Sequence, residues 1–214
     1  MKQTIFIMKA ALFSFLVLPT LFGSQASASE EAEYAVLKKA GDYELRQYKP
    51  NIVAETWVEG DFEKVGNEGF RRLFAYIDGQ NRKKQSIPMT APVSLEAERE
   101  KIPMTAPVNL EKTGGKYRIT FLMPSRYTLE TLPEPLDSRV ELKEVPGRLM
   151  AAIRYSGTWK KSLYDEKQAA LLEWLLENSL RPVGEPIFAR YNSPFALWFL
   201  RRNEVLIPVD KNPS

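Results

Sequence analysis

The string Ile87-Pro-Met-Thr-Ala-Pro-Val93 occurs again as Ile102-Pro-Met-Thr-Ala-Pro-Val108, fifteen residues further along the chain. Each copy holds two prolines, which lack a backbone N–H and fix φ, so neither copy can be a helix interior or a central strand. We therefore expect each copy to be a kinked, extended piece at a sheet edge, with its methionine, Met89 or Met104, directed at the core or a cavity. The alternative is a local duplication that only lengthens a surface hairpin.

The segments before the repeat change from a strand pattern to a helix pattern. Tyr34–Lys38 and Tyr43–Tyr48 predict a hairpin that turns at Gly41-Asp42, and Ile52–Val58 predicts a third strand. Apolar residues then recur at helical spacing until Asp78-Gly79. The stripe that we expect to face the sheet comprises Phe62, Gly66, Phe70, Leu73 and Ile77.

The same order of elements follows the repeat, which predicts two similar halves. A single curved antiparallel sheet with two packed helices, an α+β fold, is the natural solution for such a chain. The expected elements are a strand at Lys116–Met123, a hairpin of Arg139–Lys143 and Arg148–Tyr155 around Pro146-Gly147, a helix at Leu163–Leu180 with a capping box of Ser162 and Asp165, and strands at Ile187–Tyr191 and Glu204–Val209.

Residues 1–28 are typical of a secretory signal peptide. Lys2 and Lys9 precede the mostly apolar run Ala10–Phe22, and Ala26-Ser27-Ala28 is a small-residue cleavage site. The run is shorter than the ~20 residues that cross a membrane, so an uncleaved anchor is the weaker alternative. We expect a periplasmic or secreted protein without a membrane anchor after cleavage, in which residues 29–214 form one ligand-binding domain.

The composition excludes several classes of function. The chain has no histidine and no cysteine, which removes Ser-His-Asp and Cys-His catalysis and zinc sites built on imidazole or thiolate. Removing Lys2 and Lys9 lowers the formal net charge from +3 to +1, and basic and acidic residues are interspersed, so nucleic-acid binding is not expected. Phosphate-binding glycine loops are absent from the sequence as well. We expect no catalytic activity and no metal site.

The repeated string resembles the signature of the SOUL haem-binding family. Three further segments, Glu33–Gly60, Ile119–Pro135 and Ala189–Pro194 with Arg201–Glu204, are similar to the same family and occur in its order. The resemblance implies a distorted antiparallel β-barrel of two similar halves, flanked by two α-helices. It also implies that haem lies against the first helix, with basic residues near the propionates.

The first helix carries side chains that suit a flat, apolar ligand with acidic groups. Phe74 falls just outside the apolar stripe, with Asn67 and Arg71 next to it on the helix surface. Arg71 and Phe74 lie three positions apart (i, i+3) and therefore adjoin on the helix surface, so a ring and a cation are offered together. The alternative is that Phe74 is the edge of the core stripe and Arg71 is only solvated.

The second candidate wall is the loop Pro194–Leu200, which includes Phe195 and Trp198 and precedes Arg201-Arg202. It is unusually apolar for a loop, and it either plugs one end of the barrel or faces the first helix across a cleft. Family members often carry a lysine near Ala196 that helps to hold haem. This chain does not, so Arg201 or Arg202 would have to replace it.

Coordination of iron would have to be unusual in this chain. Without histidine, the candidates are Met89 and Met104 in the repeats and the phenolates of Tyr76 and Tyr191, each of which can equally be a packing residue. We expect an exported, non-catalytic protein that holds haem or a related tetrapyrrole in an apolar cleft without histidine ligation. The alternative is a module for another apolar molecule, or a protein-interaction domain with vestigial haem affinity. The predicted ligand-binding residues are Asn67, Phe70, Arg71, Phe74, Met89, Met104, Tyr191, Phe195, Trp198, Arg201 and Arg202.

Overall fold

The computed structural model describes residues 29–83 and 98–211. The predicted signal peptide and the first copy of the repeat, with Met89, lie outside these residues. The strands are β1 (Tyr34–Ala40), β2 (Tyr43–Tyr48), β3 (Asn51–Val58), β4 (Asn81–Arg82), β5 (Val108–Thr113), β6 (Lys116–Leu122), β7 (Glu134–Pro135), β8 (Glu141–Val145), β9 (Leu149–Tyr155), β10 (Leu180–Pro182), β11 (Ile187–Arg190) and β12 (Asn203–Lys211). The helices are α1 (Phe62–Ile77), α2 (Lys161–Glu177) and the short 3-10 helix η1 (Trp198–Leu200).

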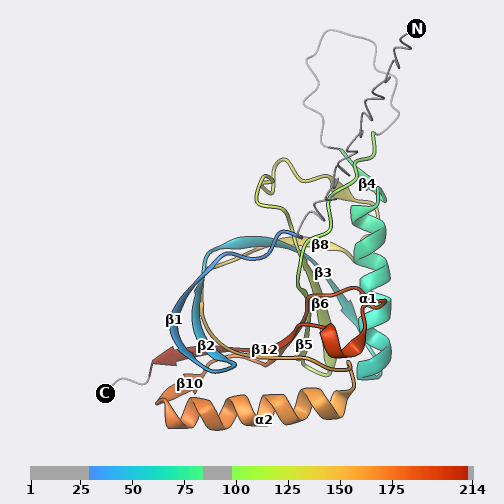
Figure 1. The fold of residues 1–214 in the computed structure, drawn as a ribbon. Helices are drawn as coiled ribbons and strands as arrows, with labels where there is room; N and C mark the ends of the chain where they lie inside the picture. The colour runs from blue at the N-terminus through green and yellow to red at the C-terminus, as the bar shows by residue number, and fades with distance from the viewer. Residues whose placement is uncertain (1–28, 84–97, 212–214) are drawn as a thin grey trace, which may run out of the picture.

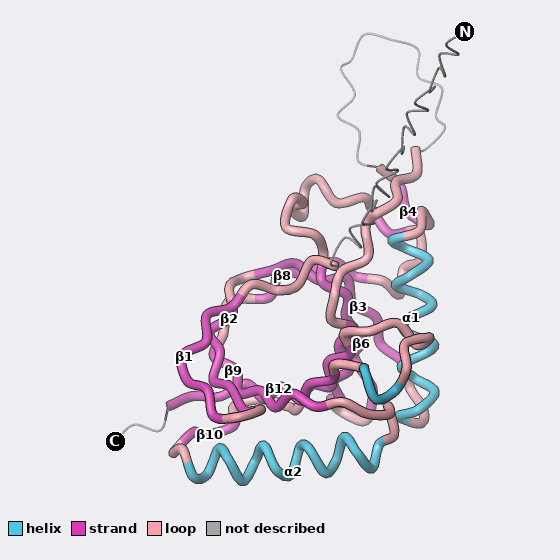
Figure 2. Tube along the Cα trace, in the orientation of Figure 1, coloured by secondary structure: helices cyan, strands magenta, loops and turns pink. Residues whose placement is uncertain are grey.

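One ten-stranded sheet dominates the fold, in the order β1-β2-β9-β12-β11-β5-β6-β3-β8, with β10 beside β12. The sheet curls into a ring, and α1 and α2 cover two adjoining sides of its outer surface (Figures 1 and 2). The predicted α+β class and its two helices are therefore confirmed. The sheet of the predicted distorted barrel is not closed, because the path of paired strands ends at β1 and β8 and these two strands do not pair with each other.

Prolines lie at the bends of two long strands of the sheet. β2 runs into β3 through Lys49-Pro50, and β8 runs into β9 through Pro146–Arg148. β8 pairs with β3 while β9 pairs with β2, and one backbone bond of 2.9 Å from Tyr48 N to Arg148 O joins the two bends. The predicted hairpin of β8 with β9 is thus wrong. Pro146-Gly147 bends one long strand where a tight turn was expected, since both of its parts find partners in the β2–β3 strand.

The sheet has two differently composed faces. Its outer face carries the main core, in which residues such as Ile119 and Phe188 are fully buried beneath the helices. α1 packs on β3 and β6, and α2 packs on β9, β10 and β12. The inner face carries polar and charged side chains around a small apolar cluster that includes Met150 and Leu206. No helix within residues 29–83 and 98–211 has the length and apolar character needed to cross a membrane.

Helix α2 differs from its prediction at both ends. It begins after Lys160, which makes no capping bond through its side chain, so the predicted capping box is wrong. Asp165 accepts hydrogen bonds from Lys161 Nζ at 2.8 and 2.6 Å, an i, i+4 pair within the first turns of the helix. The helix ends at Glu177, and Ser179 then takes a left-handed conformation with φ of 53° that leads into β10. The prediction that the helix extends to Leu180 is therefore wrong, because Asn178 and Ser179 form a turn and Leu180 begins β10.

The second copy of the repeat confirms the expected kinked, extended segment. Ile102 N donates to Ile77 O at the end of α1, at 2.8 Å, and the hydroxyl of Thr105 donates to Leu122 O. The segment then enters the sheet as β5 at Val108. Met104 is half-buried and packs against the main core, so this copy joins α1 to the sheet.

Candidate functional site

The exposed face of α1 presents two stacked aromatic rings. Phe74 is 43% exposed and lies 5.7 Å from Phe70, centroid to centroid, with only 11° between the ring planes. Phe70 is half-buried and meets the buried ring of Phe121 edge-on at 5.4 Å. The pair is therefore an aromatic shelf, defined here as Phe70 and Phe74, which is anchored in the core at one end and open to solvent at the other.

A cation lies beside this shelf. Arg71 is exposed, and none of the described residues accepts a hydrogen bond from its guanidinium or forms an ion pair with it. Its neighbour Arg72 is committed to the fold, because it donates to the hydroxyl of Thr56 at 3.2 Å and to Trp57 O at 3.0 Å. Asn67 is exposed one turn before Arg71. The face thus offers a ring, a cation and an amide, as the sequence predicted, although their role in binding stays a prediction.

The loop after β11 exposes a run of large apolar side chains. Its exposed members are Phe195 (94%), Leu197 (58%), Trp198 (57%), Phe199 (52%) and Leu200 (67%). Arg201 shapes the loop, since it donates to Ala196 O at 2.9 Å and Pro194 O at 2.8 Å while its guanidinium lies 4.4 Å from the centroid of the Trp159 ring. Because these side chains point to solvent, the loop is not a plug inside the sheet.

Arg190 connects the base of this loop to α1. Its guanidinium lies over Trp159 and Phe188, at 4.8 Å from each ring centroid, and it fills the space in front of Gly66. A Cβ at Gly66 would stand 2.9 Å from Arg190 Nη1, so a larger residue here would displace the end of the arginine side chain. The loop therefore leaves the sheet beside the first turns of α1. Sequence reasoning missed Arg190 because nothing in the pattern of β11 distinguishes it from a solvated strand end.

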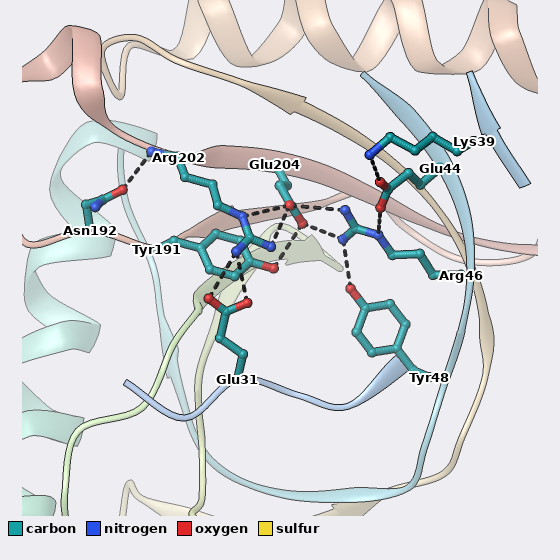
Figure 3. Close-up of polar contacts among 9 residues, drawn as sticks. All are labelled: Glu31, Lys39, Glu44, Arg46, Tyr48, Tyr191, Asn192, Arg202 and Glu204. Carbon is teal, nitrogen blue, oxygen red and sulfur yellow. Dashed lines mark hydrogen bonds and ion pairs between the residues drawn. The ribbon is translucent and has the colours of Figure 1, made fainter. Parts of the chain in front are cut away.

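Two of the predicted ligand-binding residues, Tyr191 and Arg202, lie in a buried charge network on the inner face of the sheet (Figure 3). Glu204 is fully buried and accepts from Arg46 Nη1 at 2.6 Å and Nη2 at 3.1 Å, from Arg202 Nε at 3.0 Å, and from the hydroxyl of Tyr191 at 2.9 Å. Arg202 also holds both carboxylate oxygens of Glu31 at 3.0 and 2.9 Å. The structure therefore separates Tyr191 and Arg202 from the α1 face and uses them to hold the sheet together.

The tyrosines proposed as iron ligands are held in their protonated form. Burial raises the pKa of Tyr191, and the charge of Glu204, which accepts a hydrogen bond from its hydroxyl, raises it further. Burial likewise raises the pKa of Tyr76, whose hydroxyl donates to Pro133 O at 2.9 Å. Met104 faces the core, and the described residues hold no group of three acidic, histidine or cysteine side chains that could bind a metal ion. Tyr76, Tyr191 and Met104 are thus each engaged within the fold.

Two cavities on the sheet are less suitable binding sites for a large anion than the exposed face of α1. One of about 600 Å³ lies near the N-terminal segment, but its charged lining is Glu30, Glu31, Glu33, Glu144 and Lys49, which repels carboxylates. The other, on the inner face, has about 70 Å³, far below the ~300–1,000 Å³ of sites for drug-sized ligands. Of the predicted residues, only Tyr191 lines either cavity.

The sequence is similar to proteins of one family over most of its length. The family described as "SOUL heme-binding protein" matches residues 29–208. Heme-binding protein 2 of Homo sapiens is 30% identical over 175 residues, which cover 80% of each chain. Heme-binding protein 1 of Xenopus laevis is 24% identical, over 75% of this chain and 84% of that protein.

Solved structures of low sequence identity share the fold. The C-terminal domain of EcmrR superimposes with a TM-score of 0.56 at 10% identity, over 83% of this chain and 98% of that domain. A crystal structure described as a hydrolase from Listeria innocua gives a TM-score of 0.54 at 12% identity, over 81% and 94% of the two chains. At such identities the likeness concerns the fold alone.

Proposed function

This chain belongs to the SOUL haem-binding protein family, and we propose that it binds haem or a related tetrapyrrole against the exposed face of α1. The observation that carries the proposal is the aromatic shelf of Phe70 and Phe74 beside the unpaired Arg71. A flat macrocycle can cover the ring of Phe74, and a propionate can pair with the guanidinium of Arg71. The apolar loop that contains Phe195 and Trp198 supplies further surface beside the first turns of the same helix.

Haem would bind here through its plane and its carboxylates, without a protein ligand on iron. The chain has no histidine, Tyr76 and Tyr191 are engaged in hydrogen bonds, and Met104 packs in the core. Apolar contact and charge pairing do not require the metal. We therefore assign the protein a binding role rather than a catalytic one, such as carrying or buffering the pigment.

We expect the mature protein to bind haemin and iron-free protoporphyrin with similar affinity. The haemin complex should give a broad, mainly high-spin spectrum, because no imidazole is present to ligate iron. Parallel titrations that follow absorbance and tryptophan quenching measure both properties. A strong preference for haemin that is lost on changing Met89 or Met104 would contradict ligand-free binding. Equal, weak binding of unrelated hydrophobic dyes would favour the alternative, a site for general apolar molecules.

The variant Arg71→Glu localises the site. We expect it to weaken binding of both pigments roughly tenfold, about 1.4 kcal/mol, because it places a carboxylate where the propionate binds. The melting temperature should change little, since Arg71 is exposed and no described residue pairs with it. The matched control is Arg154→Glu, which makes the same charge change at an exposed position on β9. If the two variants bind alike, α1 is not the ligand wall.

Export of the protein is part of the same proposal. It rests on Ala10–Phe22 and the cleavage signal Ala26-Ser27-Ala28, both of which precede the described residues. We expect a mature chain that begins at Ser29. Mass spectrometry of protein recovered from outside the cytoplasm decides this, and an N-terminus that retains Ala10–Phe22 would contradict it.

A further inference from the structure

The inner face of the curved sheet encloses a cavity that the haem proposal does not use. Its volume is about 70 Å³, and its walls come from both halves of the chain, through β2, β3, β5, β6, β8, β9, β11 and β12. At ~10–15 Å³ for each water-sized group, the cavity has room for roughly five such groups. This is the size of a small organic acid.

Arg148 lines this cavity without a partner for its charge. It lies in the bend between β8 and β9, and it is partly buried. Burial lowers the pKa of Arg148, and the nearby carboxylate of Glu111 compensates only in part. Within the described ranges its guanidinium donates no hydrogen bond and forms no ion pair, whereas Arg46 and Arg118 each contact a carboxylate directly.

The charges around the cavity compensate this cation only in part. The charged residues of the lining are Glu111, Arg118 and Arg148. Glu111 accepts from Arg118 Nε at 3.1 Å and also from its Nη2, so its charge is shared with that arginine. A half-buried guanidinium without a direct partner loses part of its hydration, and an anion in the cavity would compensate for that loss.

Asn109, one of the residues that line the same cavity, carries an unused hydrogen-bond acceptor. Asn109 Oδ1 is buried and has no hydrogen-bond partner, and Asn109 lines the cavity from β5. Such unpaired buried groups are rare in folded proteins and call for an explanation. A ligand with a hydroxyl or amino group could donate to this oxygen while an acidic group meets Arg148. Apolar contacts from Met150 and Ile187 would surround the rest of the ligand.

We propose that this inner cavity binds a small carboxylate that carries a hydroxyl or amino group on the neighbouring carbon. The carboxylate pairs with the guanidinium of Arg148, for which a planar two-oxygen acceptor is the best match. The neighbouring hydroxyl or amino group donates to Asn109 Oδ1. The cavity lies on the opposite face of the sheet from α1, so this site is independent of the tetrapyrrole site.

Calorimetric titration of the mature protein with glycolate tests the proposal, with acetamide as an uncharged ligand of similar size. We expect glycolate to bind and acetamide not to bind. Arg148→Gln should weaken glycolate binding at least tenfold, whereas Arg154→Gln, at an exposed position on β9, should leave it unchanged. Both variants should bind haemin like the wild type, which shows that they are folded and separates this site from the one on α1.

Three outcomes would overturn the proposal. The first is that the wild-type protein does not bind glycolate, and the second is that Arg148→Gln binds it as well as the wild type does. The third is that inorganic phosphate binds more tightly than glycolate, because the cavity would then be a site for tetrahedral anions. Acetate that binds as tightly as glycolate would overturn only the role of Asn109, since acetate lacks the second donor.

Discussion

Glu204→Gln is expected to lower the free energy of unfolding by about 3–5 kcal/mol, the typical cost of removing one member of a buried ion pair. The carboxylate is fully buried and is the shared acceptor of Arg46, Arg202 and Tyr191. Without its charge, the guanidinium of Arg46, which is only 2% exposed, stays buried with Glu44 as its remaining carboxylate partner among the described residues. Urea unfolding followed by tryptophan fluorescence measures the change.

The control for this variant is Asp210→Asn, which removes a carboxylate from the exposed end of the same strand. Asp210 Oδ2 lies 3.8 Å from Arg181 Nη2, and both side chains are more than half exposed. The loss of this ion pair should therefore cost at most ~1 kcal/mol. If Glu204→Gln costs no more than this control, the network does not stabilise the sheet.

The pH dependence of stability gives an independent signature of Glu204. Burial alone raises its pKa, but the hydrogen bonds and charges of Arg46 and Arg202 outweigh burial, so its pKa in the folded protein lies below its ordinary value of 4.5. A carboxyl group of this kind stabilises the fold above pH 4.5, and that contribution is lost as the pH falls through the lowered pKa. The Glu204→Gln variant should lack this part of the acid-induced loss of stability.

Gly69→Val should cost about 1–3 kcal/mol, because α1 touches β6 at this glycine. A Cβ at Gly69 would stand 2.5 Å from Cγ1 and 2.8 Å from both Cβ and Cδ1 of Ile119, which is fully buried and cannot move aside. The helix must therefore lift off the sheet, and the aromatic shelf that is anchored on Phe121 should move with it. Thermal or urea unfolding measures the stability, and a pigment titration measures the effect on the site.

Asn67→Val is the matched control for this second prediction. It places the same β-branched side chain in the same helix at an exposed position, so only the helix propensity changes, by less than ~1 kcal/mol. Equal losses in the two variants would mean that the close approach of α1 to β6 is not important for stability.

Local patterns predicted those elements whose signals depend only on neighbouring residues. The hairpin of β1 and β2 around Gly41-Asp42 is confirmed, and the bounds of α1 agree with the helical spacing that starts at Phe62. Phe74 and Arg71 were placed on the exposed side of this helix by their angle relative to the apolar stripe, and the structure agrees. These results follow because a helix fixes the direction of its side chains through backbone geometry alone.

Long-range pairing could not be predicted in the same way. The turn signal Pro146-Gly147 predicted a hairpin, yet β8 and β9 form one bent strand along β2 and β3. Tyr191 was predicted as a possible phenolate ligand of iron and Arg202 as a partner of the propionates. In the structure both side chains instead bind Glu204. Which partner a strand or an ion finds depends on residues far away in the chain.

The sequence by itself determined the family, the order of strands and helices that repeats in the two halves of the chain, the absence of imidazole and thiolate chemistry, and the aromatic and basic face of α1. Only the tertiary structure decided which polar strand residues face solvent and which face inward. Alternation along a strand places side chains on two faces, but it does not reveal whether the polar face meets water or lies inside a curved sheet. The curvature of this sheet turns Arg46 and Glu204 inward, where burial converts ordinary strand charges into a stabilising network, and it places Arg148 of the β8–β9 bend at the wall of a candidate binding site.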